Sequence, residues 1–178
     1  MKNTYRSNIL KLTLSAMFMA IGLVLPLLTG QIKTIGNMLL PMHIPVMLCG
    51  LICGWYYGAA VGFILPILRS VTFGMPELYP SAIAMAFELM TYGLAVGAMY
   101  SLLPKKNINI YVSLLTSMVV GRAVWGVVYA ALLSVSGDAL TWKIFISSAF
   151  LKAFPGIILQ FIIIPALMIF LKKIKLIK

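Results

Sequence analysis

Four ionisable residues lie inside otherwise apolar runs of the sequence: Arg69, Glu88, Arg122 and Lys152. A charge at the centre of a membrane costs about 2.5–3.5 kcal/mol even on a lenient scale, so such groups persist when they pair or face a water-filled cavity. Three cations face one anion here, and an anionic or strongly hydrogen-bonding ligand could balance the excess. The structural alternative is a buried ion pair, Glu88 with Lys152 or Arg122, that only locks the helices together.

Several other side chains are candidates for ligand contact. His43 precedes Ile-Pro at the start of an apolar run, where a lone histidine more often forms a local hydrogen bond. Trp125 follows Arg122 by three residues and so shares its helical face, too deep for an interfacial aromatic belt. Tyr79 and Tyr92 are also candidates for ligand contact, although Tyr79 would equally suit the interfacial aromatic belt. Arg69 could instead extend to the outer headgroups.

Catalysis is weakly supported by these residue types. The only membrane carboxylate, Glu88, could act as an acid or base on a lipid, but there is no His/Asp pairing and no metal-binding cluster. The two cysteines, Cys49 and Cys53, suit helix packing. We therefore expect no enzyme activity, no metal and no cofactor. Because no G-x-x-x-x-G-K-[ST] motif occurs, any ATP would be used by partner ATPase subunits.

The composition indicates that the candidate residues lie on membrane-spanning helices. Hydrophobic residues make up 62% of the 178 residues and charged residues 10%, with a mean hydropathy of +1.07. Soluble domains carry roughly 25% charged residues, so this chain cannot coat a water-facing surface. We predict an all-α integral membrane protein with one transmembrane domain over residues 1–178.

Glycine, proline and charge clusters divide the chain into six predicted helices. The second and third are short, yet together they are too long for one straight span, and Gly54–Gly58 supplies a turn between them. Five spans is the alternative count. The predicted ranges are approximately 8–28, 42–55, 57–73, 81–103, 110–135 and 144–171.

The basic residues predict the orientation. Cytoplasmic loops carry an excess of Lys and Arg, and with six spans the split is nine against two. The termini are then cytoplasmic, and Lys33, Lys143, Glu77 and Asp138 face outside. The cytoplasmic set is Lys2, Arg6, Lys11, Lys105, Lys106, Lys172, Lys173, Lys175 and Lys178.

Small residues mark expected helix contacts. Glycines recur every four residues, which lets backbones approach closely. On the first helix, Ala16 and Ala20 form a smooth strip that another helix could dock on. The glycines are Gly50, Gly54, Gly58 and Gly62, with Gly93 and Gly97 at the same spacing.

Taken together, these features resemble the S component of energy-coupling-factor (ECF) transporters, a family of bacterial vitamin importers. The resemblance covers the size, the six spans, the cytoplasmic termini and the basic tail. Its most specific parts are the Ala16/Ala20 strip and the run Leu40-Pro41-Met42-His43-Ile44-Pro45 with the glycine-rich segment after it.

The resemblance implies a substrate-binding subunit of the bacterial cell membrane that captures a vitamin or precursor from outside. A transmembrane T subunit would dock on the alanine strip, and two cytoplasmic ATPases would drive toppling of this chain and release inside. The pocket would lie in the outer half, between helices four to six, capped by loops 31–40, 74–80 and 137–143.

The substrate stays open at this point. Excess positive charge suggests a carboxylate such as pantothenate, whereas Glu88 could pair with a hydroxymethylpyrimidine or pyridoxine. An autonomous secondary transporter is the alternative function, although such proteins usually have longer chains with inverted repeats.

Overall fold

The computed structural model describes residues 2–28, 39–104, 106–135 and 153–174, with side chains from Asn8 onward. Within these ranges every regular element is a helix and there is no strand, which confirms the all-α prediction. A short π-turn, η1 (Leu78–Ala82), precedes α5. The α-helices are α1 (Lys2–Leu28), α3 (His43–Cys53), α4 (Trp55–Phe73), α5 (Ile83–Leu102), α6 (Asn107–Val135) and α8 (Phe154–Lys173).

Five of these helices are long and apolar enough to cross a membrane. The exception is α3, whose 11 residues reach only about 16 Å at ~1.5 Å per residue, roughly half of a bilayer core. The first helix begins at Lys2, six residues before its expected start at about residue 8, because a helix can continue past its lipid-facing part into the polar interface. Residues 144–152 of the last predicted range lie outside the described residues.

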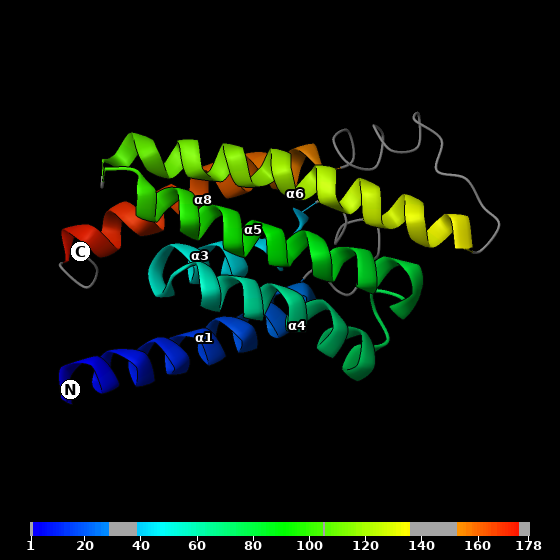
Figure 1. Cartoon of the computed structure of the whole chain (residues 1–178), viewed down its shortest axis with the longest axis horizontal. Helices are drawn as coiled ribbons and strands as arrows, with labels where there is room; N and C mark the ends of the chain where they lie inside the picture. The colour runs from blue at the N-terminus through cyan, green and yellow to red at the C-terminus, as the bar shows by residue number, and fades with distance from the viewer. Residues whose placement is uncertain (1, 29–38, 105, 136–152, 175–178) are drawn as a thin grey trace.

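The helices form a bundle in which α5 and α3 are central (Figure 1). α5 packs against α3, α4 and α6, while α3 also packs against α1, α4 and α8. The fully buried apolar side chains include Met47 of α3 and Leu89 of α5, together with Leu65 of α4 and Leu114 of α6. Ten of the eleven residues of α3 are buried, whereas α5 buries one face and leaves others, such as Leu94, exposed.

Glycines allow α3, α4 and α5 to pack backbone against backbone, as the spacing predicted. A Cβ added at Gly93 would lie 2.2 Å from the carbonyl oxygen of Gly58. One at Gly62 would lie 2.3 Å from the carbonyl oxygen of Leu89, and one at Gly50 would lie 2.5 Å from that of Gly93. No side chain fits at these positions, so the close approach of the three helices depends on glycine.

Gly54 has a different role from its neighbours in the repeat. It is the single residue between α3 and α4, with φ +107 and ψ 164, and a Cβ there would meet nothing within 4 Å. This backbone conformation is open to glycine and strained for other residues. The turn is shorter than the expected Gly54–Gly58, and it folds α3 back against α4 so that the start of α3 lies inside the bundle.

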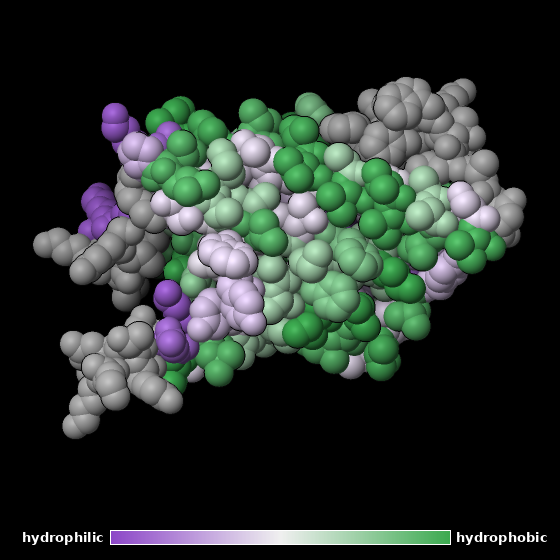
Figure 2. Space-filling view, viewed as in Figure 1, coloured by the Kyte–Doolittle hydropathy of each residue, from purple (hydrophilic) through white to green (hydrophobic). Residues whose placement is uncertain are grey.

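Polar and apolar surfaces are separated along the bundle. The first turns of α1, the last turn of α8 and the α5–α6 turn lie at one end, and η1 and the end of α6 lie at the other (Figure 1). Hydrophilic residues gather at the first of these ends, whereas the sides of the bundle are apolar (Figure 2). Outward-facing apolar side chains such as Val127, Leu115 and Ile162 are more than half exposed. With the five candidate spans, this surface identifies a multi-pass membrane protein.

The glycine packing gives a first prediction. We expect Gly93→Val to lower the apparent melting temperature of the purified protein sharply, because overpacking of a tight contact costs about 1–3 kcal/mol and this contact is with backbone atoms. Fluorescence-detected size-exclusion chromatography after heating measures the change. Leu94→Ala, at the adjacent and 40% exposed position, is the matched control. Equal melting temperatures for the two variants would contradict the assigned role.

Candidate functional site

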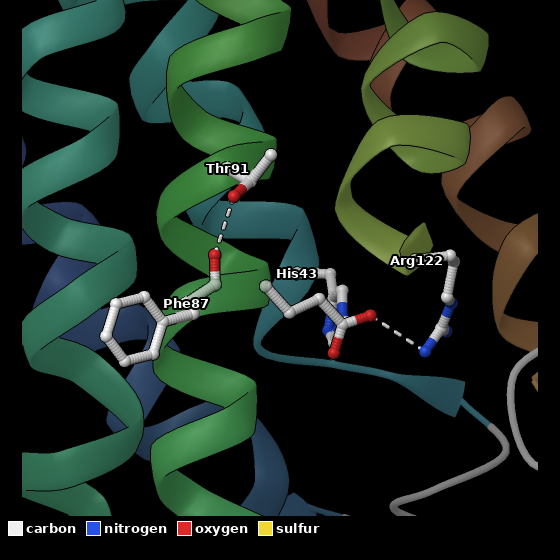
Figure 3. A network of polar contacts seen from close by, with 5 residues as sticks. His43, Phe87, Thr91 and Arg122 are labelled. Carbon is white, nitrogen blue, oxygen red and sulfur yellow. Dashed lines mark hydrogen bonds and ion pairs between the residues drawn. The ribbon is translucent and has the colours of Figure 1, made fainter. Parts of the chain in front are cut away.

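A buried ion pair joins α5 to α6 in the middle of the bundle. Arg122 Nη1 lies 2.8 Å from Glu88 Oε1, and the two residues are 6% and 2% exposed. Figure 3 shows the guanidinium of Arg122 directed across the gap toward α5. Of the two partners that the sequence left open for Glu88, the structure shows Arg122. Lys152 lies outside the described residues, so its place relative to the pair stays a prediction.

His43 lies near the same carboxylate oxygen of Glu88 as Arg122 does. Its Nε2 is 3.7 Å from Glu88 Oε1, and its ring centroid is 5.2 Å from that of Tyr92. His43 is the first residue of α3, and its backbone N–H donates to the carbonyl of Leu40, which has a positive φ of 49. Pro45 follows in the first turn, where the missing N–H costs nothing. The proline-rich run thus starts a helix at the depth of the ion pair.

The Tyr92 side chain of α5 lies between α3 and α6, where it contacts His43 and the backbone position of Gly121. It follows Glu88 by four residues and therefore faces the same side of α5. A Cβ added at Gly121 would lie 2.6 Å from the Tyr92 ring, so the glycine next to Arg122 is what lets the ring fit against α6. We refer to His43, Glu88, Tyr92 and Arg122 as the central cluster.

Several buried polar atoms near this level lack a hydrogen-bond partner among the described residues. They are both ring nitrogens of His43, Nη2 of Arg122 and Nε2 of Gln160. An unsatisfied buried donor costs about 1–3 kcal/mol, more when it is charged, so such atoms are normally matched by water or a ligand. The cluster is therefore equipped to bind a molecule with hydrogen-bonding groups.

Gln160 is a buried polar side chain, within the described part of the chain, that the sequence interpretation missed. It is 1% exposed on α8, which packs against α3 and α6. Glu88, Arg122 and Gln160 each lie roughly 20 Å from the helix end nearest the chain termini, at ~1.5 Å rise per residue. An amide inside the otherwise apolar run of α8 was the available signal, because polar groups in spans tend to be functional.

Two aromatic side chains follow Arg122 along α6. Trp125 and Tyr129 are stacked, with ring centroids 5.0 Å apart and planes 15° apart. Both are partly buried. They follow Arg122 by three and seven residues and so continue one face of α6 toward its C-terminal end.

Tyr79 and Arg69 each connect two elements. The hydroxyl of Tyr79 donates to the carbonyl of Leu132 and so joins η1 to α6. Arg69 Nη1 donates to the carbonyl of Leu23 at 2.7 Å, and this bond joins α4 to α1. The Arg69 guanidinium also lies 5.2 Å from the ring centroid of Phe73 on its own helix. Arg69 is 3% exposed and is therefore held within the protein. Ligand contact by either residue stays a prediction.

The family model for the ECF transporter, substrate-specific component, matches residues 10–168 of this chain. The chain belongs to this family. A comparison with curated proteins and with solved structures gives no match. As an ECF S component, the chain is a substrate-binding transport subunit rather than an enzyme. It works with a T subunit, ATPase subunits and a small-molecule substrate. The matched range contains the whole central cluster, Gln160 and the alanine strip.

The ion pair of this S component gives a second prediction. Arg122→Gln leaves a buried carboxylate without its partner, and breaking a buried pair in this way costs about 3–5 kcal/mol. We expect Arg122→Gln and Glu88→Gln each to lower the apparent melting temperature, and the double variant Glu88→Gln/Arg122→Gln to recover much of the loss. Thr91→Val is the control, because the exposed Thr91 hydroxyl only bonds the Phe87 carbonyl one turn away (Figure 3). Strictly additive losses in the double variant would contradict the coupling.

Proposed function

We propose that this S component captures a small vitamin or vitamin precursor from outside the cell at the central cluster. The substrate class is pantothenate-, pyridoxine- or hydroxymethylpyrimidine-like. The observation that supports this best is the set of buried polar atoms around the Glu88–Arg122 pair that have no hydrogen-bond partner among the described residues. A purely structural ion pair would be more stable with those polar atoms hydrogen-bonded.

Residues at the outer end of the bundle complete the proposed pocket. Trp125 continues the face of Arg122 toward that end, and Tyr79 is fixed there by its bond to α6. Loops 31–40, 74–80 and 137–143 would cap the pocket, and Lys152 and Arg69 remain further candidates for ligand contact. Closing loops over a buried polar site would exclude water and strengthen the polar contacts.

The partner-docking surface is proposed on α1. Ala16 and Ala20 are both exposed and lie on one face of the helix. An apolar groove lined by Ala20, Ile21, Val24 and Leu25 continues this strip. On the opposite face, Gly22 packs against Leu65 and Pro45 of the bundle. A helix of the T subunit could therefore lie against α1 without disturbing the core, and toppling driven by the ATPases would release the substrate inside.

The docking proposal is tested by separating binding from transport. We expect Ala16→Trp and Ala20→Trp to abolish vitamin uptake by cells that express the complete transporter, while calorimetry on the purified chain shows unchanged vitamin binding. A bulky ring blocks close helix packing but leaves the central cluster intact. Val119→Trp, 60% exposed on α6, is the control and should transport normally.

Three results would count against these proposals. Loss of binding in the alanine variants would reject the docking role. No tight ligand in a broad vitamin panel, or uptake by this chain in vesicles without any ATPase, would reject the proposed function as a whole.

The proposed topology has six spans in a bacterial plasma membrane, with α3 and α4 as the second and third spans and both termini in the cytoplasm. The hydrophilic end in Figure 2 would then face the cytoplasm, as expected from the excess of basic residues in cytoplasmic segments. The turn before α6 and the last turn of α8 lie at this end.

The orientation is tested by thiol labelling in intact cells. In a background with Cys49→Ala and Cys53→Ala, a cysteine at Asn107 or Lys173 should resist a membrane-impermeant maleimide, and one at Glu77 should react. Labelling after cell disruption is the control for reactivity. Reaction of Asn107→Cys and Lys173→Cys in intact cells would reverse the proposed topology.

A further inference from the structure

We infer that the substrate carries a neutral planar nitrogen heterocycle with an amino group on the carbon next to a ring nitrogen, as in a 4-aminopyrimidine. This inference rests on the proposed function and narrows its substrate class. The structural basis is the composite edge that Glu88 and Arg122 form in the centre of the bundle.

The first step of the argument is charge. Sequence reasoning counted three cations against Glu88 and so allowed for an anionic ligand. In the structure, Arg122 lies 2.8 Å from the carboxylate, and Arg69 is held by the Leu23 carbonyl and the Phe73 ring. The third cation, Lys152, lies outside the described residues, so the charges compared at the pair are those of Glu88 and Arg122. Any ligand that reaches Arg122 also meets the buried charge of Glu88. A carboxylate there would be repelled in a site where solvent screens little.

The second step is hydrogen bonding. Arg122 uses Nη1 toward Glu88, which leaves the adjacent Nη2 as a buried donor without a partner in the described part of the chain. A carboxylate has about four lone-pair sites, so Glu88 still offers acceptor capacity beside that donor. The pair thus presents a donor next to an acceptor. A ring nitrogen beside an amino group presents the complementary acceptor and donor, whereas a ligand carboxylate matches only the donor.

The third step is shape. The centroid of the Tyr92 ring lies 5.2 Å from that of the His43 ring, and the stacked rings of Trp125 and Tyr129 follow Arg122 on α6. Aromatic faces favour a planar ligand ring over a flexible chain. Gln160 Nε2 and the His43 ring nitrogens add hydrogen-bonding groups for further ring substituents. An aromatic heterocycle uses all of these features.

The test compares ligands that differ in one group. The full-length chain in lipid nanodiscs is titrated by calorimetry with 4-amino-5-hydroxymethyl-2-methylpyrimidine, its analogue without the amino group, pyridoxine and pantothenate. We expect the aminopyrimidine to bind at least tenfold more tightly than each of the others. Removing the amino group leaves Glu88 without its ligand donor, and sites built to form a hydrogen bond discriminate strongly against ligands that lack the group.

Variants of Glu88 and of a nearby control residue test whether the preference for the aminopyrimidine comes from the Glu88–Arg122 pair. Glu88→Gln should weaken aminopyrimidine binding at least tenfold and leave pantothenate binding equal or stronger. Thr91→Val, one turn away on α5, should leave both affinities unchanged, because its hydroxyl is bonded to the Phe87 carbonyl (Figure 3). If Glu88→Gln does not fold, the ligand comparison on the unmodified chain decides alone.

The outcomes separate the two proposals. Tighter binding of pantothenate or pyridoxine, or equal binding of the analogue without the amino group, overturns the inference while the proposed function stands. Failure of every member of a broad vitamin panel overturns both.

Discussion

The buried contact between Glu88 and Arg122 is the interaction on which the rest of the structure depends. A carboxylate and a guanidinium at 2.8 Å, both almost fully buried, lose their hydration, and their mutual attraction repays this only with good geometry. The pair therefore requires α5 and α6 to approach closely at one level. Gly121 meets this requirement, because its missing side chain leaves room for the Tyr92 ring directly beside Arg122.

A second constraint sets how closely α3 packs against α4 and α5: glycines, which have no side chain, occupy the contact positions. Gly50, Gly58 and Gly93 bring α3, α4 and α5 to backbone contact, and Gly54 makes the sharp turn between α3 and α4. As a result, the short helix α3 begins inside the bundle, and its first residue, His43, lies beside Glu88. Half-helices that end within the membrane plane recur at substrate sites of other membrane transporters, where a cavity tolerates the helix end.

The two faces of α1 serve different purposes. Its inner face packs on α3 and α4, and Arg69 of α4 bonds the Leu23 carbonyl near its end. Its outer face presents Ala16 and Ala20. A partner that lies against this outer face would thus act on a helix attached to the same core that holds the central cluster. This connection would give a physical route between the proposed docking surface and the proposed substrate site.

Local sequence properties were enough to predict the fold class and several helix contacts of this protein. Apolar runs, glycine spacing and proline positions depend on neighbours within a few residues, so the all-helical membrane fold, the glycine contacts and the placing of Glu88 and Arg122 within helices of the bundle could be predicted. The family resemblance added the transport role, which the family match then showed. Only the tertiary structure decided which cation pairs with Glu88, that His43 lies inside the bundle, that Arg69 bonds α1, and that Gln160 is buried at a similar depth. These facts depend on helix rotation and on turns such as Gly54, because distant residues meet only when every intervening helix has packed.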